Sequence, residues 1–314
     1  MNLEVRLRML QYIVRRLIST IPVLFGISLM LFFLLRALPG DPAQVIAGEL
    51  ATQKEVELIR QQLGLDEPVY VQYAMFLSRI VRFDLGTSTR TQYPVTQEIA
   101  PRLLNTVILA VAATILACLL GIPAGIVSAV KPYTIMDMVV TALALFGMSM
   151  PAFWLGLMLI IIFSVKLKLL PVGGSGGIVY LILPSITLAA YLLASIARNT
   201  RSAMMEVIAQ DYITTARAKG VPEKKVIIRH ALKNSFIPVI TVIGLQFGSL
   251  LGGTVLTETV FAWPGLGRLL ISSMLARDYP VIQGSILIFA LLFVLTNLIV
   301  DMLYAYFDPR VRYE

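Results

Sequence analysis

The sequence predicts an all-α membrane protein. Hydrophobic residues make up 58% of the 314 positions, charged residues only 14%, and the mean hydropathy is +0.83. The apolar residues are gathered into charge-free runs, and a helix of roughly 20 such residues crosses a bilayer core of about 30 Å. Backbone groups in lipid must be hydrogen-bonded within their own element, so these runs indicate helices. Six runs are expected to span: 17–35, 103–130, 138–165, 178–197, 234–257 and 279–300.

The first run, 17–35, follows a short segment, 1–16, that ends in two arginines. It is longer than the apolar region of a signal peptide, and no A-x-A cleavage site follows, so we expect an uncleaved first span. If both termini lie inside, the inner segments hold 15 of the 26 Lys and Arg residues and the outer segments 11, which favours this orientation. This topology makes 1–16, 198–233 and 301–314 cytoplasmic.

The segment 36–102 then lies outside and is expected to hold a small helical insertion. Thr52 with Glu55 three residues later predicts a capped helix start, and Gly64 predicts its end. Pro68 is expected to begin a second helix. A spacer without a binding role remains an equally good interpretation of this segment.

Turn and packing signals mark the middle of the chain. The sequence PVGGSGG (171–177) predicts a turn before the fourth span, and Pro151 predicts a kink in the third. The single cysteine, Cys118, cannot form an internal disulfide and is expected to pack in the second span.

The loop 198–233 is unusually charged for this chain. Its apolar residues recur at helical spacing, and Gly220 then predicts the end of that helix. Pro222 predicts the start of a second helix. The apolar positions of the first helix are Met205, Ile208, Tyr212 and Ala216, and the basic stripe of the second is Lys225, Arg229 and Lys233. A plain connector needs only a few residues, so we expect a hairpin that presents a surface to a cytosolic partner. Contact with lipid headgroups is the alternative.

Several functions are excluded by the motifs that are missing. No glycine-rich loop in the sequence is followed by Gly-Lys-Ser/Thr, so no ATP site is expected. His230 is the only histidine, which excludes histidine-based catalysis and a histidine metal site. No segment resembles a nucleic-acid module, and the net charge of +8 suits anionic lipid. We therefore expect a non-catalytic membrane subunit.

Two carboxylates lie at the ends of spans. Glu258 follows the fifth span and Asp301 follows the sixth. Because both lie at a boundary, hydrated ends are expected rather than an intramembrane proton relay.

Motifs along nearly the whole chain resemble one family. They are LPGDPA (38–43), GLDEPVYVQY (64–73), DYITTARAKG (211–220), HALKNSFIPVITVIGLQFGSLLGG (230–253), TETVFAWPGLGRLL (257–270) and RDYPVIQG (277–284). The chain resembles the membrane subunit of bacterial ABC importers for dipeptides, oligopeptides and nickel. The resemblance implies a type I ABC importer permease fold in the bacterial inner membrane. It implies as partners a second homologous permease in a heterodimer, two ABC ATPases that bind ATP and Mg, and an extracytoplasmic substrate-binding protein. The chain itself would bind no cofactor or metal.

The charged loop resembles the EAA loop, which docks on an ATPase subunit. Ala216 and Gly220 match the second alanine and the glycine of that motif, while Thr214 and Thr215 replace its Glu and first Ala. The residues implied for coupling are Tyr212, Thr215, Ala216, Arg217, Ala218, Lys219, Gly220, Lys225 and Arg229.

Two further sets of residues are hypotheses. A mildly polar stripe on the fifth span, Gln246, Ser249, Gly253 and Thr257, would line the passage beside the second permease. Buried hydrogen bonding within one bundle is the alternative for this stripe. On another face Gly244, Gly248 and Gly252 predict close helix contact. By analogy with related importers, the outer turn would contact the binding protein through Trp263, Pro264, Gly265, Leu266 and Gly267.

The expected function is therefore import of dipeptides or oligopeptides through half of a translocation pathway. Glutathione or nickel chelates are alternative loads for the same architecture, and RQQLGLDEPVY (60–70) resembles glutathione-type members. A stand-alone secondary transporter or channel is the alternative class. It would require charges or ion-coordinating clusters within the spans, and the six runs contain none.

Overall fold

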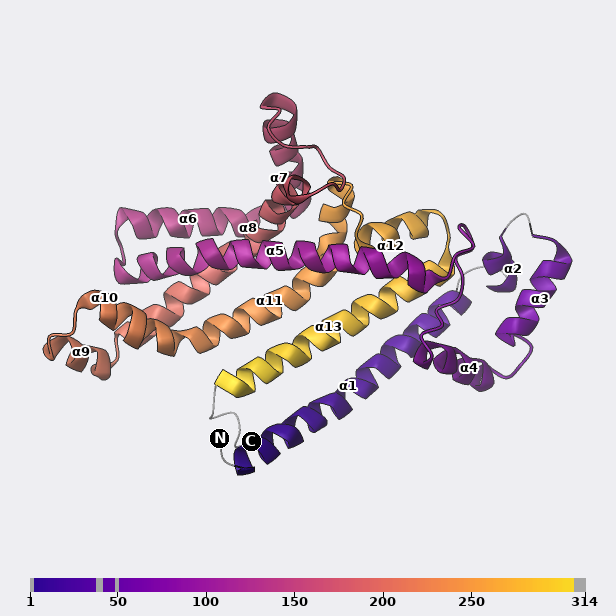
Figure 1. The fold of residues 1–314 in the computed structure, drawn as a ribbon, viewed down its shortest axis with the longest axis horizontal. Helices are drawn as coiled ribbons and strands as arrows, with labels where there is room; N and C mark the ends of the chain where they lie inside the picture. Colours follow the sequence, from indigo (N-terminus) through magenta and orange to yellow (C-terminus); the bar gives the residue numbers. More distant parts are fainter. Residues whose placement is uncertain (1–2, 38–41, 49–50, 308–314) are drawn as a thin grey trace.

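The computed structural model describes residues 3–37, 42–48 and 51–307, and within these ranges it contains helices and loops but no strand (Figure 1). The elements are α1 (Leu3–Ala37), α2 (Pro42–Ala47), α3 (Gln53–Leu63), α4 (Val69–Val81), α5 (Val95–Val130), α6 (Ile135–Ser149), α7 (Ala152–Leu159), the π-helical η1 (Ile160–Lys166), α8 (Ile178–Ile208), α9 (Asp211–Ala218), α10 (Glu223–Lys225), the π-helical η2 (Val226–Leu232), α11 (Lys233–Val260), α12 (Leu266–Leu275) and α13 (Tyr279–Phe307).

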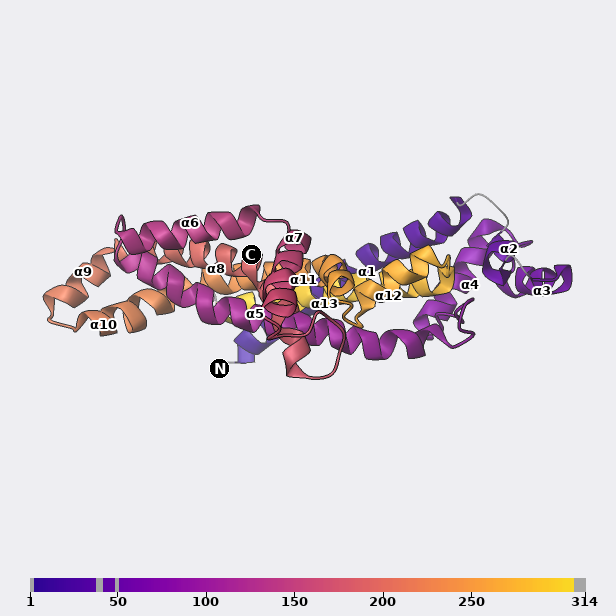
Figure 2. The same cartoon turned by 90° about the horizontal axis from the view of Figure 1, so that it is seen from above.

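The molecule is elongated, and the two segments of short helices lie at opposite ends. The hairpin of α9 and α10 forms one end, and the insertion of α2, α3 and α4 forms the other, in both views (Figures 1 and 2). The start of α1 and the end of α13 both point toward the hairpin (Figure 1). The placement of both terminal segments on the same side of a membrane as the charged loop stays a prediction.

The core of the bundle is the contact between α5 and α8. Small residues let the two helices approach closely, as is typical inside membranes. A Cβ added to Gly121 would lie 2.9 Å from the carbonyl oxygen of Leu193, and one added to Gly125 would lie 2.5 Å from that of Ala197. No side chain larger than hydrogen fits at these two positions unless the helices move apart.

The predicted count of six spans is not confirmed. Among the described residues four helices are long and apolar enough to cross a bilayer: α5, α8, the continuous helix that begins at Glu223, and α13. The pair of α6 with α7 and η1 would add a fifth if it counts as one span. The described apolar part of α1, Ile18–Phe33, is shorter than the 18 residues required of a spanning helix.

The third predicted span, 138–165, is not one straight helix. The axes of α6 and of α7 with η1 differ by 105°, and the break lies at Met150 and Pro151. Proline disfavours the helical conformation of the residue before it, and Met150 has an extended backbone with ψ 128°. The expected kink is therefore a sharp corner, from which α7 projects sideways (Figure 1).

The boundaries of the charged loop also differ from the prediction. Met205 and Ile208 belong to α8, which continues well beyond the predicted end of the fourth span, whereas Tyr212 and Ala216 belong to α9. The single helix predicted through these four residues is wrong. Gln210 has an extended backbone with ψ 148° between the two helices. No proline or glycine marks this break, so the sequence carried no local signal for it.

The insertion follows the sequence closely. Thr52 forms a capping box with Glu55, and Gly64 ends α3 in the left-handed conformation at φ 60°. Thr52 donates both its N–H and its hydroxyl to the Glu55 carboxylate, which lowers the pKa of Glu55. The hydroxyls of Tyr73 on α4 and Ser28 on α1 lie 2.8 Å apart, so the insertion is fastened to the first helix.

We predict that Gly125→Ala destabilises the bundle, because its Cβ would press on the α8 backbone. Overpacking of this kind typically costs about 1–3 kcal/mol. The measurement is the apparent Tm of the detergent-solubilised protein, followed by size-exclusion chromatography after heating.

The matched control is Gly252→Ala, because a Cβ at Gly252 meets no atom within 4 Å. Both changes gain the same intrinsic helix propensity, so the difference between them isolates the steric clash. Equal melting temperatures for the two variants would contradict the close approach of α5 and α8.

Candidate functional site

The hairpin is built on its own small core. Ile213 of α9 and Val226 and Ala231 of η2 are buried against Met204 of α8 and Ala129 of α5. The hairpin is thus packed onto the ends of two long helices rather than suspended as a loose loop. A displacement of the hairpin would therefore act directly on α5 and α8.

The tip of the hairpin is held in one conformation by a turn and an ion pair. Gly220 has φ +74°, which glycine adopts without strain. Arg217 donates from Nε and Nη2 to the two carboxylate oxygens of Glu223, at 3.1 and 2.7 Å. This hydrogen bonding raises the pKa of Arg217. Both partners are partly exposed, so the pair adds more to the shape of the tip than to stability.

The structure brings the predicted coupling residues together at this end of the molecule. Ala216 is half-buried against the hairpin core, and the other eight are exposed: Tyr212, Thr215, Arg217, Ala218, Lys219, Gly220, Lys225 and Arg229. The sequence analysis missed Ile228, whose side chain is 53% exposed. In sequence it lies between Val226 and Ala231, which share the buried face of the helix. Its helical spacing from these two residues places it on another face, and this spacing could have predicted its exposure. The end of the molecule therefore offers basic groups around an exposed apolar side chain.

A second unpredicted feature braces the base of the hairpin. Arg201 of α8 donates from Nε and Nη2 to the carboxylate of Asp137 on α6, at 2.7 and 2.8 Å. The same carboxylate accepts from the Tyr133 backbone N–H and from the hydroxyl of Ser128 on α5. One buried carboxylate thus joins α5, α6 and α8. The partners are distant in sequence, so no local pattern marked the pair.

The polar stripe on α11 does not form one open surface. Gln246 donates to the hydroxyl of Ser195 on α8 at 3.0 Å, and Ser249 is exposed. Thr257 is completely buried, so it lines no open passage in this conformation, while Gly253 lies between them on the same helix. The passage role of Gln246, Ser249 and Gly253 stays a prediction.

The glycine face of α11 is confirmed in part. A Cβ on Gly244 would lie 2.4 Å from Val300 of α13, and one on Gly248 would lie 3.5 Å from Asn297. These two glycines pack against α13, as expected for a small-residue face. Gly252 is exposed and does not contribute to that contact.

Glu258 is not the hydrated span end that the sequence analysis expected. Its side chain is 0% exposed and accepts hydrogen bonds from the Thr106 hydroxyl at 2.6 Å and from the Arg268 backbone N–H at 3.0 Å. Arg268 is in the first turn of α12, where backbone N–H groups favour a negative charge. The carboxylate therefore joins α11, α5 and α12. The side chain of Asp301 lies outside the described residues.

The turn formed by residues 263–267, which the sequence analysis expected to be exposed to a binding protein, is also mostly buried. Trp263 is 6% exposed and donates from Nε1 to the carbonyl oxygen of Asn105, while Asn105 donates back to the carbonyl oxygen of Pro264. Leu266 is fully buried, and Gly265 and Gly267 pack closely around Glu258. Apart from half-buried Pro264, these residues are buried in this conformation, and their contact with a binding protein stays a prediction.

Comparison with known proteins identifies the family. Residues 121–313 match the binding-protein-dependent transport system inner membrane component, and residues 9–110 match the N-terminal model of the same transport-system membrane component. The glutathione transport system permease protein GsiC of Escherichia coli K12 is 48% identical over 306 residues, which cover 98% of this chain and 100% of that protein. The same permease of Shigella flexneri serotype 5b has the same identity and coverage.

Solved structures confirm the fold. An inward-facing form of the MetNI methionine ABC transporter matches with a TM-score of 0.58 and 18% identity, covering 68% of this chain and 97% of that one. An amino acid ABC transporter crystallised with histidines matches with a TM-score of 0.52, 18% identity and coverage of 68% and 94%. The type I ABC importer permease fold predicted from the sequence is thus confirmed. The chain belongs to the binding-protein-dependent transport system inner membrane components and is a permease subunit of an ABC importer.

Proposed function

We propose that the protein forms half of the translocation pathway for glutathione or a closely related short peptide. The observation that carries this proposal is the 48% identity to glutathione permeases over 98% of the chain and the full length of those relatives. The sequence analysis placed dipeptides and oligopeptides first and glutathione second. The relatives favour glutathione over dipeptides and oligopeptides, and they also favour it over nickel chelates.

The proposed assembly contains a second homologous permease, two ABC ATPases and an extracytoplasmic binding protein. In this assembly ATP and Mg are bound by the ATPases, and the present chain binds no cofactor. The exposed basic hairpin, with Ile228 at its surface, supports docking on an ATPase. Two function classes were open from the sequence, and a stand-alone transporter would leave this packed hairpin without a role.

The membrane orientation is part of the proposal. The hairpin, with its excess of Lys and Arg, lies on the cytosolic side of a bacterial inner membrane, together with both terminal segments. The insertion of α2, α3 and α4 then lies outside, because it occupies the opposite end of the molecule (Figure 1).

We propose that coupling runs through packed contacts rather than through chemistry on this chain. Docking of an ATPase moves α9 and η2, and the buried core around Ile213 and Met204 transfers this movement to α8. The pair of Arg201 and Asp137 passes it on to α6 and α5. Rigid elements of this kind are a common means of linking distant sites.

The first test is to purify the tagged chain in mild detergent and to identify its partners. We expect recovery with a second permease and two ATPases, and ATP hydrolysis that rises when a binding protein loaded with glutathione is added. Transport of glutathione by the single chain in liposomes would overturn the importer assignment.

Gly220→Pro is expected to abolish ATPase association and transport. Proline fixes φ near −65°, whereas the turn requires φ +74°, so the tip must rearrange. Pull-down of the ATPases and uptake into proteoliposomes measure the effect.

Gly220→Asn is the control, because asparagine tolerates the left-handed conformation better than other residues. Normal association and uptake in Gly220→Pro would exclude the hairpin as the coupling site.

Asp137→Asn is expected to uncouple hydrolysis from transport while the subunits still associate. The amide cannot accept both guanidinium hydrogen bonds as a carboxylate does, so α8 loses its charged link to α6. We expect uptake per ATP hydrolysed to fall about tenfold, within the range typical of coupling between sites.

The control is Arg102→Gln, which removes the more exposed pair of Arg102 with Glu98 near the opposite end of α5. An equal loss in both variants would show that the Asp137 pair serves general stability alone.

A further inference from the structure

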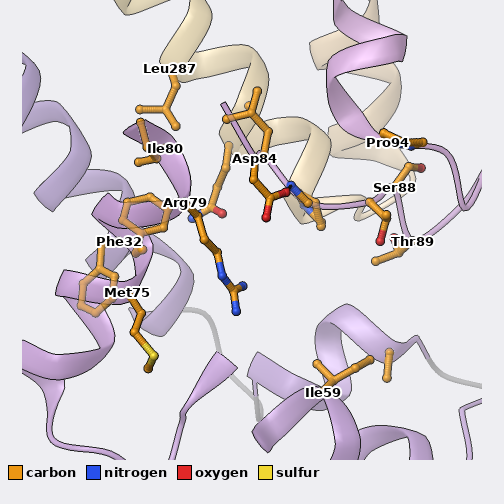
Figure 3. A pocket seen from close by; sticks show the side chains of 18 of the residues that line it. Phe32, Ile59, Met75, Arg79, Ile80, Asp84, Ser88, Thr89, Pro94 and Leu287 are labelled. Carbon is orange, nitrogen blue, oxygen red and sulfur yellow. Dashed lines mark hydrogen bonds between the residues drawn. The ribbon is translucent and has the colours of Figure 1, made fainter. Parts of the chain in front are cut away.

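A cavity of about 960 Å³ lies between the insertion and the bundle (Figure 3). Its lining comes from α1, α2, α3, α4, α13 and the loops on either side of α4. The volume falls within the range of about 300–1,000 Å³ that is usual for small-molecule sites. None of the site residues predicted from the sequence lines this cavity.

The cavity has two kinds of wall. Phe32, Met75, Ile80 and Leu287 form an apolar side, and the opposite side combines Ser88 and Thr89 with Ile59 and Pro94 (Figure 3). A lipid chain would need apolar contacts on all sides, which this lining does not provide. A ligand that is apolar on one side and polar on the other fits the lining better.

Charged groups of both signs face the same space. The Arg79 guanidinium extends into the open centre of the cavity, and Asp84 lies on the wall beside it (Figure 3). Guanidinium groups bind carboxylates in a bidentate manner, and a carboxylate suits an ammonium group. Glu55, the third charged group of the lining, accepts two hydrogen bonds from Thr52, and Oδ1 of Asp84 accepts one from the Gly86 backbone N–H. Among the described residues no group of three His, Cys, Asp or Glu side chains could hold a metal ion.

We infer that this cavity binds the transported peptide at the outer face, before it enters the pathway. The inference rests on the proposed function, which supplies the side of the membrane and the ligand class. Arg79 binds a ligand carboxylate, Asp84 binds its ammonium group, and the apolar wall contacts its side chains. Gln92 and Gln283 line the same space. Their amide nitrogens donate to the carbonyl oxygens of Thr89 and Leu31, so it is their amide oxygens that suit the N–H groups of such a ligand.

The test is isothermal titration calorimetry of reduced glutathione with the permease–ATPase complex in lipid nanodiscs, without the binding protein. We expect saturable binding that Arg79→Gln weakens at least tenfold, as befits the loss of a charge-assisted pair. Arg79→Lys is expected to retain part of it. Arg82→Gln is the matched control, because Arg82 is exposed, lies three residues further along and does not line the cavity.

A chemical variant of the ligand separates recognition from folding. Glutathione diethyl ester lacks the carboxylates, so it is expected to bind weakly to the wild type and with the same affinity to Arg79→Gln. As a second measurement, Thr87→Cys in a Cys118→Ala background places a thiol on the cavity wall. We expect S-methylglutathione to slow its alkylation.

The outcomes distinguish this inference from the function on which it rests. Uptake of glutathione with its binding protein, combined with unchanged glutathione binding in Arg79→Gln or no protection at position 87, overturns the cavity site and leaves the function standing. Loss of binding-protein docking in Arg79→Gln with glutathione binding intact would make the cavity a docking site and also overturn the inference. Absence of glutathione uptake by the wild-type complex overturns the proposed load itself.

Discussion

The buried carboxylate of Glu258 is the interaction on which the end of the bundle away from the hairpin depends. It accepts from Thr106 on α5 and from the first turn of α12, and two glycines approach it closely enough that no other residue fits beside it. A buried charge is tolerated only when its hydrogen-bonding capacity is satisfied. The turn around Trp263 is therefore part of this arrangement, and its tryptophan and glycines are buried in the packing around Glu258.

A corresponding carboxylate organises the opposite end. Asp137 joins α5, α6 and α8 where the hairpin begins, and the close contact of α5 and α8 connects the two ends. Both carboxylates lie near the ends of long apolar helices, where each holds together elements that are far apart in sequence. The central pair of α5 and α8 therefore has a polar anchor toward each end, from Thr106 to Glu258 and from Arg201 to Asp137. In the coupling that we propose, movement at the hairpin is transmitted along this pair.

The two terminal regions differ in how they are held. The insertion is capped and aromatic, and Tyr73 fastens it to α1. The hairpin has a hydrophobic core of its own and exposes basic groups around Ile228. One end thus offers a cavity of mixed polarity, and the other offers an exposed charged surface. Small ligands suit the first kind of surface and protein partners the second.

The sequence by itself determined the features that depend on local chemistry. Apolar runs predicted helices, Thr52 and Gly64 predicted the limits of α3, and the charged loop predicted an exposed hairpin. Only the tertiary structure decided which polar residues are buried. Glu258 accepts a hydrogen bond from Thr106, and Asp137 accepts from Arg201. These donors lie on helices distant in sequence, and only folding brings them close to the carboxylates. The corner between α6 and α7 was marked by its proline, but its angle depends on packing, for which no local pattern exists.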